Sequence, residues 1–354
     1  MGMRAVIARA AVRHVHVLLV EVPGHWRTRV AVERAVLSRG WALAVTPADA
    51  DLLAVCGPPV ERLADAVEVL WRQMAGPRAR IELHDAEDLP AALDEARATL
   101  LDTEHHRHEA SHRPNAADTR MDHGGMDHGG MDMSPGGLPL AQGGGDRDGL
   151  EMDVLNVRLG PVLPFWPAGL VLRCALQGDV IVHAAVEGIG PEVPPPDGPP
   201  ETASARTMDN VVSLLALAGW ADGAGEARRV RDAMLWGEDR AATTARLRRL
   251  HRRVKRARLL RWSLSGIRPL GRQDLQRHGL PGGLGGDTYA RLLAMFDRIF
   301  IDDPSRDHSA PAFPISVLAD LVTGLDLATA RLVVASLDLS DVWSSHEDHE
   351  VSHA

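Results

Sequence analysis

The sequence is poor in cysteine, in aromatic residues and in lysine. Cys56 and Cys174 are the two cysteines among 354 residues, and they lie far apart in the chain. So few thiols cannot build a Cys-x-x-Cys pair, a zinc ribbon, a disulfide framework or a cysteine-ligated iron–sulfur cluster within one chain. Aromatic residues make up 4%, so the core must consist mainly of alanine, valine and leucine. Lys255 is the single lysine, so the rest of the basic charge is carried by arginine.

Long apolar runs are also missing. No stretch approaches the ~18 uninterrupted apolar residues of a membrane-spanning helix, and residues 1–13 carry charge without the apolar centre of a signal peptide. We therefore expect a cytoplasmic protein, or one at the cytoplasmic face of a membrane that it reaches only through partner proteins. The net charge of -9 argues against general nucleic-acid binding, and no nucleic-acid partner is expected.

The length of the chain favours two domains. Hydrophobic residues make up 45% and charged residues 25%, which suffices for a core and excludes a wholly disordered chain. Shifts in composition separate an α/β domain, a flexible His/Met/Gly-rich linker, an α+β and mostly helical domain, and a polar tail. The predicted boundaries of these four parts are 1–102, 103–149, 150–343 and 344–354.

Short apolar runs alternate with amphipathic stretches in the first domain. Strands are predicted over residues 16–20, 42–45, 51–56 and 80–83, and helices over residues 27–39, 60–74 and 89–101. This alternation predicts a mainly parallel sheet. Ligands of such sheets bind beyond the carboxyl ends of the strands, which makes the turn after Cys56 the expected ligand crevice.

The second domain opens with strands and continues with helices. Strands are predicted over residues 152–157, 169–176 and 178–182, the first two as a hairpin. Helices are predicted over residues 207–218, 226–235, 241–264, 288–300 and 314–337.

Histidine and methionine recur in the predicted linker, and aspartate shares their five-residue spacing over residues 121–133. Thioether and imidazole groups together suit Cu(I), whereas imidazole with carboxylate suits Ni(II), Cu(II) or Zn(II). The alternative is weak adventitious binding, because no flanking fold preorganises these groups. The candidate ligands for copper or nickel are His105, His106, His108, His112, Met121, His123, Met126, His128, Met131 and Met133.

Positive charge is concentrated in residues 246–261, on a predicted helix with an apolar stripe at Leu247, Leu250, Val254 and Ala257. Such a helix can bind anionic lipid, nucleic acid or an acidic protein surface. The alternative, which the acidic net charge favours, is a core helix whose charged face is solvated or paired.

Enzyme motifs are missing as well. No GxSxG, Walker or GxGxxG motif stands in a strand–turn–helix context. No histidine or carboxylate is positioned by the sequence to activate Cys56, so we interpret it as a small buried hydrophobic residue. We expect no catalysis by this chain alone.

The first domain resembles the small iron–sulfur subunit of respiratory complex I and of membrane-bound NiFe hydrogenases. The resemblance covers Ala48-Asp-Ala-Asp-Leu-Leu-Ala-Val-Cys-Gly57, Leu63-Ala-Asp-Ala-Val67 and Leu70-Trp-Arg-Gln-Met74 with Gly76-Pro77-Arg78. That family holds a four-iron cluster with four cysteines, none of which this sequence has. The resemblance therefore implies the sheet scaffold without an iron–sulfur cluster.

The second domain resembles the large subunit of the same complexes, the one that carries the quinone site. Val157-Arg-Leu-Gly-Pro161 and Ala175-Leu-Gln-Gly-Asp-Val-Ile181 are similar to that family's hairpin, and the later residues that match in order are Ser265, Gly266, Ile267, Gly271, Asp274, His278, Gly279, Leu280, Gly282, Gly286 and Tyr289. The family's two hairpin histidines fall on Leu163 and Pro167 here, and Tyr289 does not match the tyrosine assigned to quinone. The cysteine pairs that hold nickel and iron in the hydrogenases are absent.

The resemblance implies a fusion of two subunit scaffolds that lacks the ligands for electron transfer. The function expected first is an accessory or assembly subunit of a complex I-like NADH-quinone oxidoreductase or NiFe hydrogenase, with subunits of that complex as partners and no cofactor of its own. One alternative is the binding or delivery of copper or nickel through the linker. Another is a quinone-binding oxidoreductase subunit, as transfer from the family implies.

Overall fold

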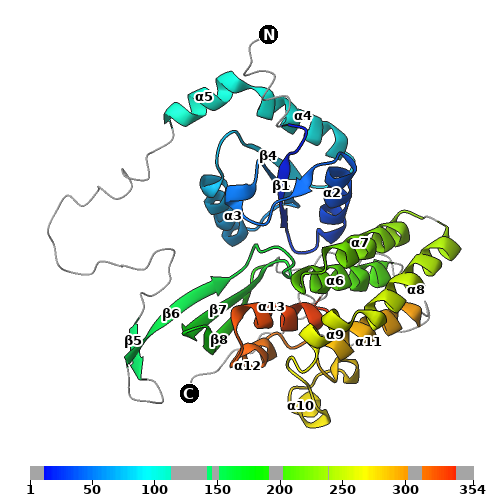
Figure 1. Ribbon diagram of the computed structural model, residues 1–354. Coiled ribbons are helices and arrows are strands. Elements are labelled where there is room, and N and C mark those ends of the chain that lie inside the picture. Colours follow the sequence, from blue (N-terminus) through cyan, green and yellow to red (C-terminus); the bar gives the residue numbers. More distant parts are fainter. Residues whose placement is uncertain are drawn as a thin grey trace. The chain divides into compact units, whose positions relative to one another are not determined.

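The computed structural model describes residues 12–112, 142–145, 151–190, 202–237, 239–301 and 313–339 (Figure 1). Over 142–145 and 151–153 the backbone alone is described. The chain divides into two compact units, Met1–Leu140 and Ala141–Ala354. The first unit is α/β with a parallel sheet, and the second has an antiparallel sheet followed by helices, which confirms the predicted fold class.

Four parallel strands form the sheet of the first unit, in the order β2-β1-β3-β4. They are β1 (His16–Glu21), β2 (Ala42–Leu43), β3 (Leu52–Cys56) and β4 (Ala79–Leu83). The inner strand β3 is buried at all five positions. This burial explains why the strand is a continuous apolar run: a parallel strand covered by helices on both faces of the sheet has no side that faces solvent.

Three helices cover this sheet: α2 (Trp26–Ser38), α3 (Glu61–Gln73) and α4 (Leu89–Leu101). Val36 of α2 and Leu93 of α4 pack in one apolar cluster with Cys56. The chain moves from β1 to β2 in one direction along the sheet and from β3 to β4 in the other. Right-handed crossovers then place α2 and α3 on opposite faces, as Figure 1 shows.

A further helix, α5 (Thr103–His112), follows α4 directly. The sequence predicted these residues as the start of the flexible linker, and the structure corrects this. Asp102 ends α4 and its carboxylate accepts hydrogen bonds of 3.0 Å from the backbone N–H groups of Glu104 and His105. The hydrogen bond with His105 in particular lowers the pKa of the Asp102 carboxyl group. This carboxylate caps the new helix, so the first unit includes α5.

The second unit begins with an antiparallel sheet in the order β5-β6-β7-β8. Its strands are β5 (Gln142–Gly145), β6 (Glu151–Leu159), β7 (Leu170–Gln177) and β8 (Val180–Gly188). The predicted hairpin is β6 and β7, which pair from Val154↔Gln177 to Leu159↔Leu172. Strand β8 runs six residues past the predicted end at Val182, because residues up to Gly188 continue to pair with β7.

Eight helices are described beyond this sheet. Their bounds are α6 (Ala203–Leu217), α7 (Ala221–Leu235), α8 (Arg240–Arg256), α9 (Arg258–Leu264), α10 (Arg272–Arg277), α11 (Thr288–Phe300), α12 (Val317–Val322) and α13 (Leu327–Ser336). Two apolar clusters organise them. One joins the sheet to α12 and α13, and the other joins α6, α7, α8, α9 and α11.

Two of the predicted helices are each divided in the structure. The predicted helix 241–264 breaks at Ala257, whose backbone is extended between α8 and α9. The predicted helix 314–337 breaks between α12 and α13, where Gly324 has a φ of 85° and donates its N–H to the carbonyl of Ile181 in β8. The Asp326 carboxylate then caps α13 by accepting from the N–H of Thr329 at 2.9 Å. Hydrogen bonding to the sheet thus interrupts an otherwise helical pattern.

Buried arginines join the helices of the second unit. The side chain of Arg231 on α7 is 0% exposed and pairs with Asp209 of α6 and with Asp232. Arg291 of α11, 1% exposed, donates to the hydroxyl of Ser336 on α13 at 2.8 Å and to the carbonyl of Gly286 at 2.7 Å. Burial lowers the pKa of Arg291 to about 10, which leaves it charged at neutral pH.

None of the helices that the structure describes combines the length and the apolar character that a bilayer span requires.

Replacing Arg231 by methionine is expected to lower the free energy of unfolding of the second unit by about 3 kcal/mol, because Asp209 would remain buried without its guanidinium partner. The matched control is Arg229→Met on the same helix. Arg229 is exposed and pairs with Glu226, so its loss should change the free energy by less than about 0.5 kcal/mol. Urea unfolding followed by circular dichroism measures both. Equal losses in the two variants would contradict the role given to the buried pair.

Candidate functional site

The sequence predicted a ligand crevice at the carboxyl edge of the parallel sheet, at the turn after Cys56. The chain leaves β1 toward β2 and leaves β3 toward β4, so the ends of these neighbouring strands form a topological switch point. His25 follows β1 and Gly57 follows β3. Gly57 has a φ of 103°, and a Cβ added there would overlap the imidazole carbons of His25. The turn therefore requires glycine, both for its backbone conformation and for the imidazole packed against it.

Two imidazoles lie at this edge. Burial lowers the pKa of His25; the charge of the neighbouring His84, which follows β4, also lowers it, and a hydrogen bond with the backbone of His84 opposes this in part. These effects together favour the neutral form of the His25 imidazole. Near this end of β1, Arg29 pairs with Glu21 at 2.8 Å and with Glu33 at 2.9 Å, so one guanidinium is shared by two carboxylates. Among the described residues, the edge offers imidazole nitrogens and no activated nucleophile.

Both cysteines are buried within sheets. Cys56 is 0% exposed and burial raises the pKa of its thiol to about 12, and Cys174 in β7 is 2% exposed with its pKa also raised by burial. The prediction that Cys56 is a small buried hydrophobic residue is confirmed. Thiols held neutral in this way are poor nucleophiles and poor metal ligands.

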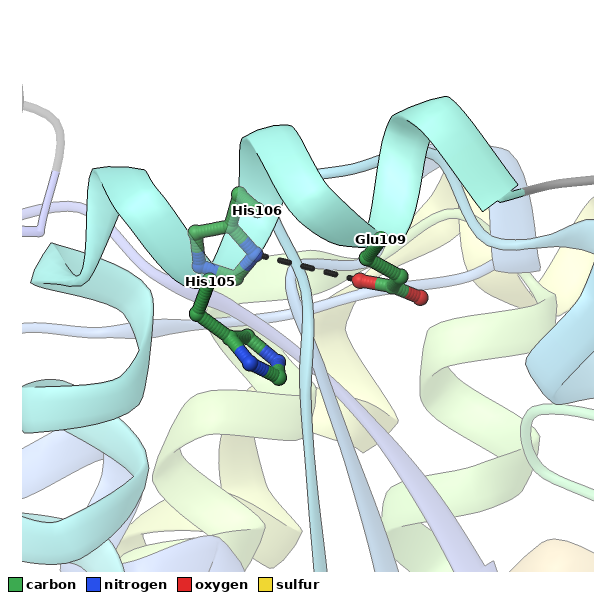
Figure 2. A group of neighbouring side chains, drawn as sticks. All are labelled: His105, His106 and Glu109. Carbon is green, nitrogen blue, oxygen red and sulfur yellow. Dashed lines mark ion pairs between the residues drawn. The ribbon is translucent and has the colours of Figure 1, made fainter.

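The described metal-ligand candidates lie on α5. His105, His106 and Glu109 offer ligand atoms that all lie within 4.8 Å of one another (Figure 2). The Nδ1 atom of His106 is 3.9 Å from a carboxylate oxygen of Glu109. That nitrogen is buried and has no hydrogen-bond partner in the described part of the chain. Its ring is oriented from the other side, where Nε2 lies 2.9 Å from the carbonyl oxygen of Thr99.

A buried arginine fixes the carboxylate of this group. Nε of Arg78 donates to Oε1 of Glu109 at 2.7 Å, and its terminal nitrogen pairs with the same oxygen. The guanidinium also stacks over Trp71 at 3.9 Å. The other carboxylate oxygen, Oε2, is the one that lies toward His106. Arg78 thus holds the Glu109 carboxylate in one orientation, in the way that residues hydrogen-bonded to a metal ligand fix the position of that ligand.

The separation of the His106 nitrogen and the Glu109 oxygen, 3.9 Å, is close to what a small transition metal needs. Ligands at ~2.0–2.2 Å in a tetrahedron lie roughly 3.4 Å from one another, so a shift of about 0.5 Å would bring His106 and Glu109 into place. Their chemistry, two imidazoles and one carboxylate, suits Ni(II), Cu(II) or Zn(II). His105 is exposed and leaves the group open to solvent.

Of the other predicted ligands, the structure describes His108 and His112, and neither belongs to this group. The rings of His108 and His112 stack on each other with centroids 4.2 Å apart, one helical turn along α5. Nδ1 of His112 lies 2.8 Å from the carbonyl oxygen of His108, so that nitrogen is already engaged. The remaining candidates lie outside the described residues: Met121, His123, Met126, His128, Met131 and Met133. Glu109 and Arg78 are the residues that sequence reasoning missed.

The groups implied by the resemblance do not fit the residues present. An iron–sulfur cluster or a nickel–iron centre needs several thiolates, and the chain has two cysteines, buried in different units. At the positions of the quinone-site histidines, Leu163 packs against the core of the second unit. The neighbouring Trp166 donates from its indole nitrogen to the carbonyl of Leu170 at 2.8 Å. This loop is used for packing.

No known family matches the chain, and no curated protein is significantly similar to it.

Replacing Gly57 by alanine is expected to destabilise the first unit by at least about 3 kcal/mol, because a left-handed backbone and overlap with His25 act together. The control is Gly40→Ala. Gly40 also has a positive φ, of 75°, but open space around it, so its replacement should cost about 1–2 kcal/mol. In Gly57→Ala/His25→Ala the overlap is removed, and the cost should fall toward that of the control. Urea unfolding measures the loss of free energy of unfolding in each variant. Equal losses in Gly57→Ala and Gly40→Ala would show that packing against His25 contributes nothing.

Proposed function

We propose that this protein is a redox-inactive accessory or assembly subunit of a complex I-like NADH-quinone oxidoreductase or NiFe hydrogenase. It acts by docking onto subunits of that complex, in the cytoplasm or at the cytoplasmic face of the membrane. The observation that carries the proposal is the burial of both thiols, Cys56 and Cys174, in a chain whose sequence resembles two electron-transferring subunits. A scaffold of that kind cannot carry electrons without metal-binding thiolates, so we infer that it serves to bind partner subunits.

The architecture of the two units supports this proposal. The first is an α/β sheet domain, and the second is an antiparallel sheet, which includes the predicted hairpin, followed by a helical body; this is the arrangement that the resemblance implies for a fusion of the small and large subunits. Leu163, at one of the two positions that match the quinone-site histidines, packs against the core of the second unit. The proposal assigns no catalytic step to the chain.

Purification of the affinity-tagged full chain from its native host tests this function. We expect it to migrate on a density gradient with identified subunits of a complex I-like or hydrogenase complex, and to contain no stoichiometric iron or nickel by elemental analysis. A tagged unrelated protein of similar size and charge serves as the control. Migration as a lone chain, or a tightly held iron–sulfur or nickel centre, would overturn the proposal.

A second candidate function is the binding and delivery of Ni(II) or Cu(II). The observation in its favour is the unpartnered Nδ1 atom of His106, which lies toward a carboxylate oxygen of Glu109 that Arg78 does not bond. In this function α5 supplies an ordered docking point for the ion. The His/Met-rich segment that follows α5 would exchange the ion with a partner.

Isothermal titration of the full chain with Ni(II) tests this second function. Glu109→Gln and His105→Ala/His106→Ala are each expected to weaken the tightest site at least about tenfold, because each removes a ligand. Affinity should also fall as the pH is lowered, since protons compete for imidazole nitrogens.

The matched control for this titration is His14→Ala/His183→Ala, which removes two exposed histidines elsewhere in the chain. It should leave the tightest site unchanged. If all variants bind Ni(II) equally, the binding is adventitious and the group on α5 is a structural contact.

A further inference from the structure

The surface of α8 and α9 carries the strongest concentration of charge in the chain. Residues 240–273 contain twelve arginines or lysines and no aspartate or glutamate, although the whole chain has a net charge of -9. Leu247, Leu250 and Val254 of α8 are buried in the helical core, as the sequence predicted. The cations on the remaining faces of the two helices are exposed: Arg246, Arg248, Arg249, Arg252, Arg253, Lys255, Arg256, Arg258 and Arg261.

Two large apolar side chains lie among these cations. Leu259 and Trp262 of α9 are each 81% exposed, the highest values among the large hydrophobic residues that the structure describes. They are three positions apart and therefore share one side of the helix. The opposite side is formed by Leu260 and Leu264, which pack into the helical core. The helix thus has two apolar sides, of which the core covers one.

We propose that α8 and α9 bind the headgroup surface of an anionic phospholipid bilayer, with Leu259 and Trp262 inserted at its interface. The charge of this surface is complementary to anionic lipid, and each arginine or lysine near such a surface contributes favourably. An indole ring is suited to the headgroup level, and a leucine side chain beside it gains by leaving water. This gives the chain a direct contact with the membrane, where the sequence led us to expect contact through partners alone.

The exposed apolar pair favours lipid over nucleic acid. Nucleic acid would be held by the arginines and could stack on Trp262, but it offers little to Leu259. The interface of a bilayer accommodates both side chains and the surrounding guanidinium groups at once. The short helix α9 also presents Arg258 and Trp262 four positions apart, so charge and apolar surface reach the same plane.

Co-sedimentation of the full chain with lipid vesicles tests this surface. We expect binding to vesicles of phosphatidylcholine with phosphatidylglycerol, little binding to phosphatidylcholine alone, and a steep loss of binding as salt is raised. Leu259→Ser/Trp262→Ser should lower the partition coefficient at least about tenfold, because the apolar part of the interaction is lost. Both residues are exposed, so the fold should be retained, which circular dichroism checks.

Matched controls separate the apolar and the electrostatic contributions. Val45→Ser removes an exposed hydrophobic residue of the first unit, 56% exposed, and should leave the partition coefficient unchanged. Arg258→Gln/Arg261→Gln should weaken binding to anionic vesicles severalfold, whereas Arg97→Gln/Arg107→Gln, two exposed arginines of the first unit, should not.

Three results would overturn the proposal. The first is equal binding to neutral and anionic vesicles. The second is an unchanged partition coefficient after Leu259→Ser/Trp262→Ser. The third is tight binding to duplex DNA in the absence of any binding to vesicles, which would assign the surface to nucleic acid.

Discussion

Buried guanidinium groups hold together segments of this protein that are far apart in sequence. Arg78 fastens α5 to the first unit through Glu109, and Arg231 joins α7 to Asp209 of α6. Arg291 ties α11 to α13 and to the loop before it. Each of these charges is removed from water, so each must keep its partners or destabilise the fold. A chain with a single lysine relies on arginine for this purpose, and the planar group can donate in several directions at once.

The parallel sheet was predictable because its signal is local. Apolar runs of strand length alternate with helical spacing, and that pattern fixes the class of fold. The breaks in the helices were not predictable in the same way. Residues between α12 and α13 carry a helical pattern, but Gly324 and Leu325 form hydrogen bonds with β8, and this competing ladder decides the outcome. The helix α5 was missed because its composition resembles a linker, while the contacts that order it come from Thr99 and Arg78.

The candidate site was predictable in its residue types and not in its geometry. Composition drew attention to His105 and His106, but nothing local distinguishes Glu109 as their partner, because its orientation depends on Arg78, 31 positions earlier. The turn at Gly57 was predictable from the strand that precedes it. The imidazole of His25 that packs against this glycine comes from the loop after β1, and only the register of β1 beside β3 brings them together.

The exposed pair on α9 has a consequence for the protein's behaviour in concentrated solution. Leu259 and Trp262 are surrounded by positively charged side chains. Two copies of the protein that approach each other through this surface therefore repel each other before the apolar side chains meet. The arginines therefore act as gatekeepers against self-association. Their protection extends over a Debye length of about 8 Å at physiological ionic strength and shrinks to about 3 Å at 1 M salt. Concentrated salt would thus screen the electrostatic repulsion between two copies and leave the apolar side chains of Leu259 and Trp262 free to associate.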